Sequence, residues 1–116
     1  MKPKTKKISD DLPRQTAYRC LEDVIGCKWS VSVLVAIAEG VARPGAMEKH
    51  IAGISTKILS ERLRKLTQSG LLDQHRYPES PPRTEYELTV FGREVVALVV
   101  RMHQLDEVRL TSSPPS

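Results

Sequence analysis

The chain has 116 residues, 40% of them hydrophobic, which suits one domain with a modest core and leaves no room for a second domain. Its formal net charge is +4 at pH 7, but removing the four lysines of the first seven residues from the 18 basic side chains leaves 14 basic against 14 acidic residues. Total charge therefore does not by itself indicate nucleic-acid binding. No stretch reaches the roughly 18 apolar residues of a membrane-spanning helix, and two cysteines are too few for a disulfide framework. We expect a cytoplasmic protein with free thiols and no membrane partner.

Both ends of the chain lack apolar periodicity. Residues 1–14 are rich in Lys and Pro, and residues 111–116 read TSSPPS. Such segments bury too little apolar surface to fold, so we expect a flexible basic tail at the N-terminus and a second flexible tail at the C-terminus. The folded unit is predicted over residues 15–110.

Four helices are predicted in the first part of the folded unit. Apolar residues recur at helical spacing over residues 15–25 and again over 29–39, where most sides are apolar and a buried central helix is indicated. Gly40 and Pro44 bracket a connection, after which residues 46–51 have room for a short helix only. The best-defined helix runs from about residue 55 to 69, with Gly70 at its C-terminal end.

A hairpin and a last helix complete the pattern. Polar and apolar residues roughly alternate over 71–77 and 83–89, and the proline-rich segment 78–82 between them predicts a stiff turn. Thr89 is a suitable N-cap for a helix that runs to about residue 109. Helices followed by a two-stranded ribbon and a final helix are the element order of a winged helix-turn-helix. The predicted fold class is therefore mainly α with a small β-hairpin wing.

The helix over residues 55–69 has two different faces. At 100° per residue its leucines at positions 59, 63 and 66 share one side and should face the core. The opposite side carries side chains that are able to read base edges in the major groove. An ordinary solvated surface is the alternative, but the preceding short helix and the basic hairpin favour DNA recognition. The base-reading candidates are Lys57, Ser60, Glu61 and Arg64.

Further side chains are suited to phosphate oxygens. Ser55 and Thr56 lie at the start of this helix, where backbone N–H groups and hydroxyls favour anions. Arg62 and Lys65 flank the polar face, although Arg62 points near the core side and an alternative role is to tie the helix to its neighbour. In the hairpin, two arginines flank the proline turn and could reach phosphates or a minor groove; the alternative is a salt bridge to one of the neighbouring glutamates. These two arginines are Arg76 and Arg83.

Catalysis and metal binding have no support in the sequence. The three histidines, His50, His75 and His103, are scattered, and their spacing to the cysteines matches no zinc or catalytic motif. A glycine-rich phosphate loop and a nucleophile–base pair are absent as well. We therefore predict a protein that is not an enzyme and needs no cofactor.

The last helix carries more apolar surface than one core requires. The run 95–100 reads VVALVV, and a small domain covers only one side of it, so the remainder is expected to pack against a second copy. Two-fold symmetry would place two recognition helices about 34–36 Å apart, which matches successive major-groove faces of DNA. The predicted partners are double-stranded DNA and a second copy of the chain.

Over about residues 16 to 105 the sequence resembles the HxlR-type winged-helix regulators. The resemblance implies a homodimeric repressor or activator, with the helix at 55–69 in the major groove, the hairpin as wing, and a dimer interface formed by the first and last helices. The matching residues, in chain order, are DVIG (23–26), KW (28–29), GIS (53–55), Lys57, Leu59, RL (62–63), Leu66, GL (70–71), YPE (77–79), PPR (81–83), EY (85–86), LT (88–89) and GR (92–93). The implied interface residues are Tyr18, Leu21, Val95, Leu98, Val99, Met102 and Leu105.

Several members of this family sense oxidants through a cysteine near the N-terminus. The corresponding position here is Thr16, so the sensing cysteine is absent from its usual place. Cys20 lies one helical turn further on, and Cys27 stands where the family usually has glycine. Either thiol could react if it is exposed or close to a base, but an inert, buried cysteine is the favoured interpretation.

Three functional hypotheses follow from these residues. The first is a sequence-specific, double-stranded DNA-binding regulator that acts as a homodimer on a pseudo-palindromic operator. The second adds release of DNA under control of a thiol, with Cys20 as the candidate. The third is a winged helix used only for protein interaction, with Glu61 discouraging DNA. A small-molecule effector is not specified by any motif.

Overall fold

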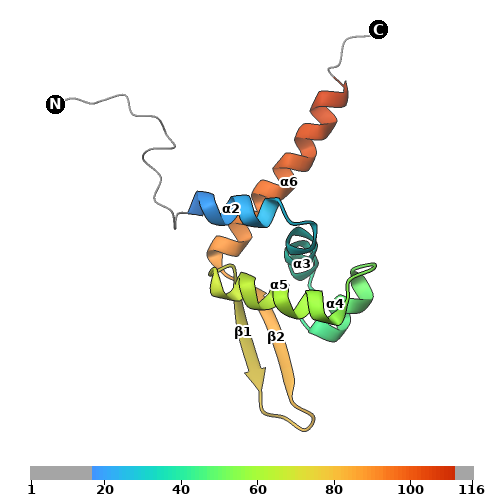
Figure 1. The fold of residues 1–116 in the computed structure, drawn as a ribbon, viewed down its shortest axis with the longest axis vertical. Coiled ribbons are helices and arrows are strands. Elements are labelled where there is room, and N and C mark those ends of the chain that lie inside the picture. Colours follow the sequence, from blue (N-terminus) through green and yellow to red (C-terminus); the bar gives the residue numbers. More distant parts are fainter. Residues whose placement is uncertain (1–16, 112–116) are drawn as a thin grey trace, which may run out of the picture.

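The computed structural model describes residues 17–111, and its elements follow the predicted order (Figure 1). Every predicted element is present, and the described ends lie within two residues of the predicted ones. The expected tails at 1–14 and 112–116 lie outside the described residues, whereas Thr111, assigned to a tail, is the last residue of a helix. The elements are α2 (Ala17–Ile25), α3 (Lys28–Ala38), α4 (Pro44–His50), α5 (Thr56–Gln68), β1 (Leu72–Tyr77), β2 (Arg83–Leu88) and α6 (Val90–Thr111).

The core surrounds α3, as its apolar sequence predicts. Val33 and Leu34 of this helix are completely buried, and α3 contacts α2, α4, α5, α6 and β2. The helix α5 adds its leucines at helical spacing, all of them buried. The predicted division of α5 into an apolar and a polar side is therefore confirmed for the apolar side, whose residues are Leu59, Leu63 and Leu66.

A tight turn joins α4 to α5. Ile51 and Ile54 are buried on either side of it, and Gly53 between them has a φ of 83°, in the left-handed region that favours glycine. Ser55 then caps α5, because its Oγ accepts a hydrogen bond from the backbone N–H of Ile58 at 3.1 Å. The turn is thus fixed by a buried apolar pair and a helix cap, and it sets the direction of α5.

The C-terminal end of α5 is locked to the start of α6. Gly70 ends α5 with a φ of 83°, and the N–H of Leu71 returns to the carbonyl of Leu66 at 2.9 Å. Thr89, the predicted N-cap, accepts the N–H of Gly92 at 2.9 Å and donates its hydroxyl to the carbonyl of Gly70 at 2.6 Å. A Cβ on Gly92 would overlap the carbonyl of Leu71. We refer to this arrangement of Gly70, Leu71, Thr89 and Gly92 as the α5–α6 joint.

The strands β1 and β2 form an antiparallel hairpin whose register runs from Leu72 opposite Leu88 to Tyr77 opposite Arg83. The hairpin extends away from the helices at the bottom of Figure 1. Its base is fixed by a hydrogen bond from the N–H of Tyr86 to the carbonyl of Ala42 at 2.8 Å. This wing is therefore held beside the connection between α3 and α4.

The helix α6 is only partly packed. Val95 and Val99 are 1% and 4% exposed and belong to the core of the chain itself, which corrects their assignment to an interface with a second copy. From Arg101 to Thr111 every residue is exposed, and this half of α6 projects away from the other helices (Figure 1). None of the helices between residues 17 and 111 is long and apolar enough to cross a membrane.

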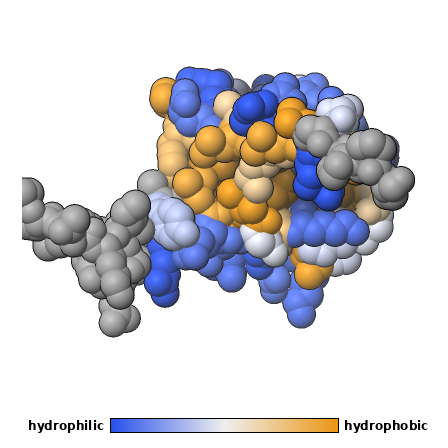
Figure 2. Space-filling view, turned by 90° about the horizontal axis from the view of Figure 1, so that it is seen from above, coloured by the Kyte–Doolittle hydropathy of each residue, from blue (hydrophilic) through white to orange (hydrophobic). Residues whose placement is uncertain are grey.

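An apolar surface is left uncovered at the end of the molecule that α2 and α6 form. Figure 2 shows a broad hydrophobic region on this face, with hydrophilic residues at its edge. The large apolar side chains exposed on these two helices are Tyr18, Val90, Leu98, Val100, Met102, Leu105, Val108 and Leu110.

Candidate nucleic-acid interface

The polar side of α5 faces solvent. Lys57, Ser60 and Arg64 are exposed, and Glu61 is half-buried. Within the part of the chain that the structure describes, none of these four side chains takes part in an ion pair or a side-chain hydrogen bond. Two cations, a hydroxyl and a carboxylate are therefore available together on one helix surface. Their contact with bases stays a prediction.

The hydroxyls at the start of α5 are engaged inside the chain. Ser55 caps the helix through Ile58, and the Oγ1 of Thr56 donates to Oε1 of Glu48 on α4 at 2.9 Å. The bond between Thr56 and Glu48 connects the two helices of the helix-turn-helix. A phosphate at this point would bind the first backbone N–H groups of α5, which have no partner within a helix.

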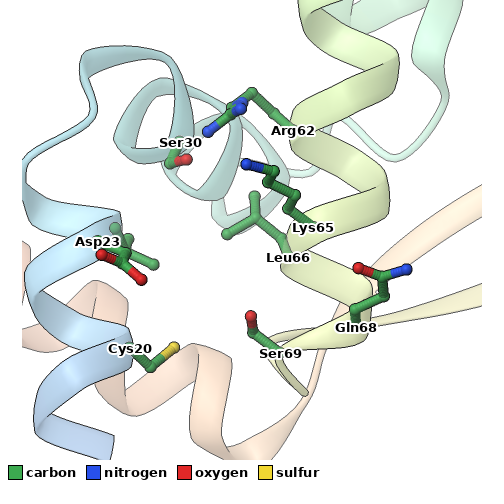
Figure 3. A pocket seen from close by; sticks show the side chains of 9 residues that line it. Cys20, Asp23, Ser30, Arg62, Lys65, Leu66, Gln68 and Ser69 are labelled. Atoms are coloured by element: carbon green, nitrogen blue, oxygen red, sulfur yellow. The ribbon is translucent and has the colours of Figure 1, made fainter. Parts of the chain in front are cut away.

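Arg62 and Lys65 do not share the open face of Lys57 and Arg64. Arg62 is half-buried, and its Nη1 donates to the sulfur of Cys27 at 3.6 Å, so it ties α5 to the start of α3, as the alternative interpretation predicted. Both side chains also line a hollow between α2, α3 and α5 (Figure 3). Lys65 is exposed and can turn to a phosphate, whereas Arg62 would first have to leave Cys27; both phosphate contacts stay predictions.

The two wing arginines are in different situations. Arg83 pairs with Glu79 at 2.9 Å and with Glu85 at 3.0 Å, and its guanidinium lies over the ring of Tyr77 at 4.1 Å. The salt-bridge alternative is thus the one found for Arg83. Arg76 is exposed and, among the described residues, has no ion-pair partner. It is the wing cation available to a phosphate.

Sequence reasoning missed Arg43. This exposed side chain precedes Pro44 at the start of α4 and pairs with Glu85 of the wing at 3.3 Å. It lies beside a hollow of about 350 Å³ between the start of α4 and the tip of the wing. A basic residue directly before a helix-starting proline was the available signal, and it adds a cation between α4 and the wing.

The two cysteine thiols have opposite environments. Burial raises the pKa of Cys20 above its usual value, a hydrogen bond with Ser69 lowers it in part, and the charge of Asp23 raises it further. Burial also raises the pKa of Cys27, but hydrogen bonds from Ser30 and from the N–H of Trp29, with the charge of Arg62, outweigh it and leave the pKa below its usual value. Cys27 is the N-cap residue of α3. The structure therefore favours Cys27 over Cys20 as the more acidic thiol.

The described residues contain no metal site, since His, Cys, Asp and Glu side chains between residues 17 and 111 nowhere gather in a group of three.

The structure does bring together a helix with an open polar face, a tight turn before it, and a two-stranded ribbon after it, all on one helical core. This arrangement is a winged helix-turn-helix, the fold of a large class of DNA-binding regulators.

Comparison with known proteins gives the family within this class. Residues 24–113 match the HxlR-like helix-turn-helix family. The chain is 42% identical over 83 residues to an HTH-type transcriptional regulator of Synechocystis. This match covers 72% of the chain and 62% of the relative, so the chain spans less than two thirds of the relative's length. The chain belongs to the HxlR-like helix-turn-helix family, whose members are transcriptional regulators and not enzymes.

Solved structures agree with this assignment. A transcriptional regulator of the MarR family from Enterococcus faecalis superposes with a TM-score of 0.75 at 25% identity, over 92% of this chain and 96% of that one. The redox regulator HypR in its oxidised form superposes with a TM-score of 0.69 at 28% identity, over 87% of this chain and 100% of HypR. The predicted fold class and family are therefore confirmed.

Proposed function

We propose that this regulator binds double-stranded DNA sequence-specifically, as a homodimer on a pseudo-palindromic operator. In this proposal α5 enters the major groove and the wing contacts the backbone or the adjacent minor groove. The observation that carries it is the open face of α5, where Lys57, Ser60, Glu61 and Arg64 have no ion-pair partner among the described residues, opposite a fully buried row of leucines.

The chemistry of this face suits base recognition. Arg64 and Lys57 donate to the O6 and N7 acceptors of guanine, Ser60 donates or accepts, and Glu61 accepts from the amino group of cytosine. Phosphate contacts then come from Arg76 on the wing, from Arg43, and from the backbone at the start of α5. Lys65 and Arg62 add two more when their side chains turn out of the hollow between α2, α3 and α5. The resulting site carries base recognition on one helix and positioning contacts on both sides of it.

The homodimer is supported by the uncovered apolar face. Leu98, Met102 and Leu105 are 47%, 43% and 48% exposed, and their spacing along α6 places them on one side of the helix. Exposed apolar side chains gathered on one face are typical of a protein interface. A second copy packed there by two-fold symmetry would present two α5 helices to one side of DNA, about 34–36 Å apart.

The experiment that tests this proposal is selection of random duplex DNA by the purified protein, followed by titration of the recovered motif. We expect an inverted repeat and an affinity that falls steeply with salt, because phosphate contacts release counterions. Arg64→Ala should cost about 1–3 kcal/mol and relax specificity at one base position per half-site. Arg101→Ala, on the projecting part of α6, is the matched control and should leave the motif unchanged.

Equal affinity for all sequences by the unmodified protein would contradict sequence-specific recognition. Absence of any salt dependence would favour the remaining hypothesis, in which the winged helix binds protein partners only.

A second candidate function is control of DNA binding by a thiol, and the environment of Cys27 favours it. The sulfur lies at the N-cap of α3 and contacts Arg62 of α5 at 3.6 Å. Oxidation or alkylation there would break the contact between the two helices. Cys20, the first candidate, is less suited because its pKa is raised and thiolate is the reactive form. The similarity to the redox regulator HypR is in line with this candidate.

A further inference from the structure

A hollow lies behind the recognition helix, between α2, α3 and α5 (Figure 3). Its volume is about 500 Å³, within the range of roughly 300–1,000 Å³ that small-molecule sites occupy. Its lining on α5 consists of Arg62, Lys65, Leu66 and Gln68 and does not include Lys57 or Arg64, so a molecule bound in it need not displace a base from those two side chains. Polar side chains around it include Cys20, Asp23, Ser30, Arg62, Lys65 and Ser69.

Opposite charges face each other across this hollow. Arg62 and Lys65 reach into it from α5, and Asp23 reaches into it from α2 (Figure 3). Among the described residues, no ion pair joins Asp23 to either cation. A charged pair held apart by open space is suited to a molecule that carries both charges and binds between them.

The remaining walls suit a small organic body. Val24 and Leu66 are 4% and 2% exposed and form an apolar part of the lining. Ser69 lies at the end of α5 with its hydroxyl turned toward Cys20 (Figure 3). A site with apolar walls and a few convergent polar groups is the usual composition of a ligand pocket.

We propose that this hollow binds a small zwitterion, with its carboxylate between Arg62 and Lys65 and its ammonium group at Asp23. The bound molecule acts as an effector of DNA binding. This second part rests on the proposed function, because it requires that the two cations of α5 contribute to phosphate binding in the ligand-free protein.

The coupling follows from the position of the two cations. A carboxylate that holds Lys65 and Arg62 in the hollow competes with DNA phosphates for the same side chains. Each phosphate contact withdrawn from DNA lowers the salt slope of binding by about one. We therefore expect the ligand to weaken DNA binding and to make it less dependent on salt.

The binding part is tested on the full chain without DNA. The isotope-labelled protein is titrated with 4-(aminomethyl)benzoate and with the common amino acids, and the backbone amide signals of Ser30, Lys65 and Ser69 are followed by NMR. We expect a saturable shift of these signals by a zwitterion, and weaker binding of benzoate and of benzylamine, which carry one charge each. Asp23→Asn and Lys65→Gln should each lower the affinity for the zwitterion at least about tenfold, since each removes a charged hydrogen bond.

Matched controls separate this effect from general electrostatics. Glu22→Gln changes the neighbouring carboxylate of α2, and Lys49→Gln changes an exposed lysine of α4; both should leave binding unchanged. No saturable shift with any of these zwitterions, equal binding of the single-charge compounds, or equal weakening by the controls would overturn the site. Zwitterion binding that leaves the affinity for the selected DNA motif unchanged would overturn the effector role. A protein that selects no DNA motif would contradict the proposed function and leave the NMR result standing.

Discussion

Single side chains around the two cysteines shift the pKa values of their thiols in opposite directions. Cys27 lies at the N-terminus of α3, where backbone N–H groups and Arg62 stabilise negative charge on sulfur. Cys20 lies against α5, where burial and the nearby carboxylate of Asp23 act in the opposite direction. The sequence placed both thiols near basic residues, but their hydrogen-bond partners come from the fold and could not be derived from spacing.

We predict that Cys27 reacts faster than Cys20 with iodoacetamide near neutral pH. A lowered pKa means a larger thiolate fraction at a given pH, so the difference should be greatest below the ordinary thiol pKa and should narrow as pH rises. Mass spectrometry of each alkylated peptide measures the two rates. Arg62→Gln should slow alkylation of Cys27, whereas Arg64→Gln, on the same helix, should not; the reverse order of the two cysteines would contradict the prediction.

A second residue-scale prediction concerns Gly92. Because a Cβ there would overlap the carbonyl of Leu71, Gly92→Ala forces the start of α6 away from β1 and should lower the free energy of unfolding by about 1–3 kcal/mol. Gly45→Ala is the control, since a Cβ at Gly45 meets nothing within 4 Å. Urea unfolding followed by circular dichroism measures both. Equal stability of the two variants would show that the joint tolerates a side chain.

At the scale of elements, periodicity predicted where the helices and strands lie and which side of α5 is buried. It could not predict what neighbours occupy the flanks of α5, and this is why Arg62 and Lys65, placed beside the polar face by their angle, are found lining a hollow. Pairing of Arg83 was open in the sequence for a similar reason. Its partners are Glu79 in the turn and Glu85 two residues further along β2, so the pairing depends on how the turn folds and on the side-chain conformations, which spacing alone does not fix.

Ser55 caps the N-terminus of α5, and we expect this cap to contribute to the free energy of unfolding. Ser55→Ala removes the acceptor for the N–H of Ile58 and should cost about 1 kcal/mol. Ser60→Ala, in the middle of the same helix and exposed, should cost nothing or stabilise slightly, because alanine is the better helix former. Thermal and urea unfolding of the two variants provide the comparison. A larger loss for Ser60→Ala would contradict the assigned cap.

At the scale of the whole molecule, polar and apolar surfaces lie on different parts of the fold. The wing and α5 lie at one end, and the apolar face of α2 and α6 lies at the other (Figures 1 and 2). The apolar run of the last helix predicted an excess of apolar surface, but the sequence could not divide it between the core and a partner. Val95 and Val99 are buried in the core because the part of α6 that follows the α5–α6 joint packs against α3.

We predict that charge on the outer side of α6 prevents dimerisation. Leu98→Glu combined with Leu105→Glu should give a monomer in sedimentation equilibrium, since two carboxylates would be buried without partners in the interface. Gln104→Glu adds charge at an exposed position of the same helix and serves as the control. The double variant should also lose most of its affinity for the selected DNA motif, because one half-site contact remains. A dimer of unchanged stability would place the interface elsewhere.

The α5–α6 joint fixes the angle between α5 and α6. The helix α6 has 22 residues, about 33 Å at 1.5 Å per residue, and it leaves the body from a point that is hydrogen-bonded to the end of α5. In a dimer held through α6, the distance between the two α5 helices therefore depends on the angle between α5 and α6, which the contacts of Thr89 and Gly92 fix. A tilt of about 5° at the joint would move the far end of α6 by about 3 Å, so the tolerated spacing of half-sites should respond to substitutions that touch neither the DNA nor the partner.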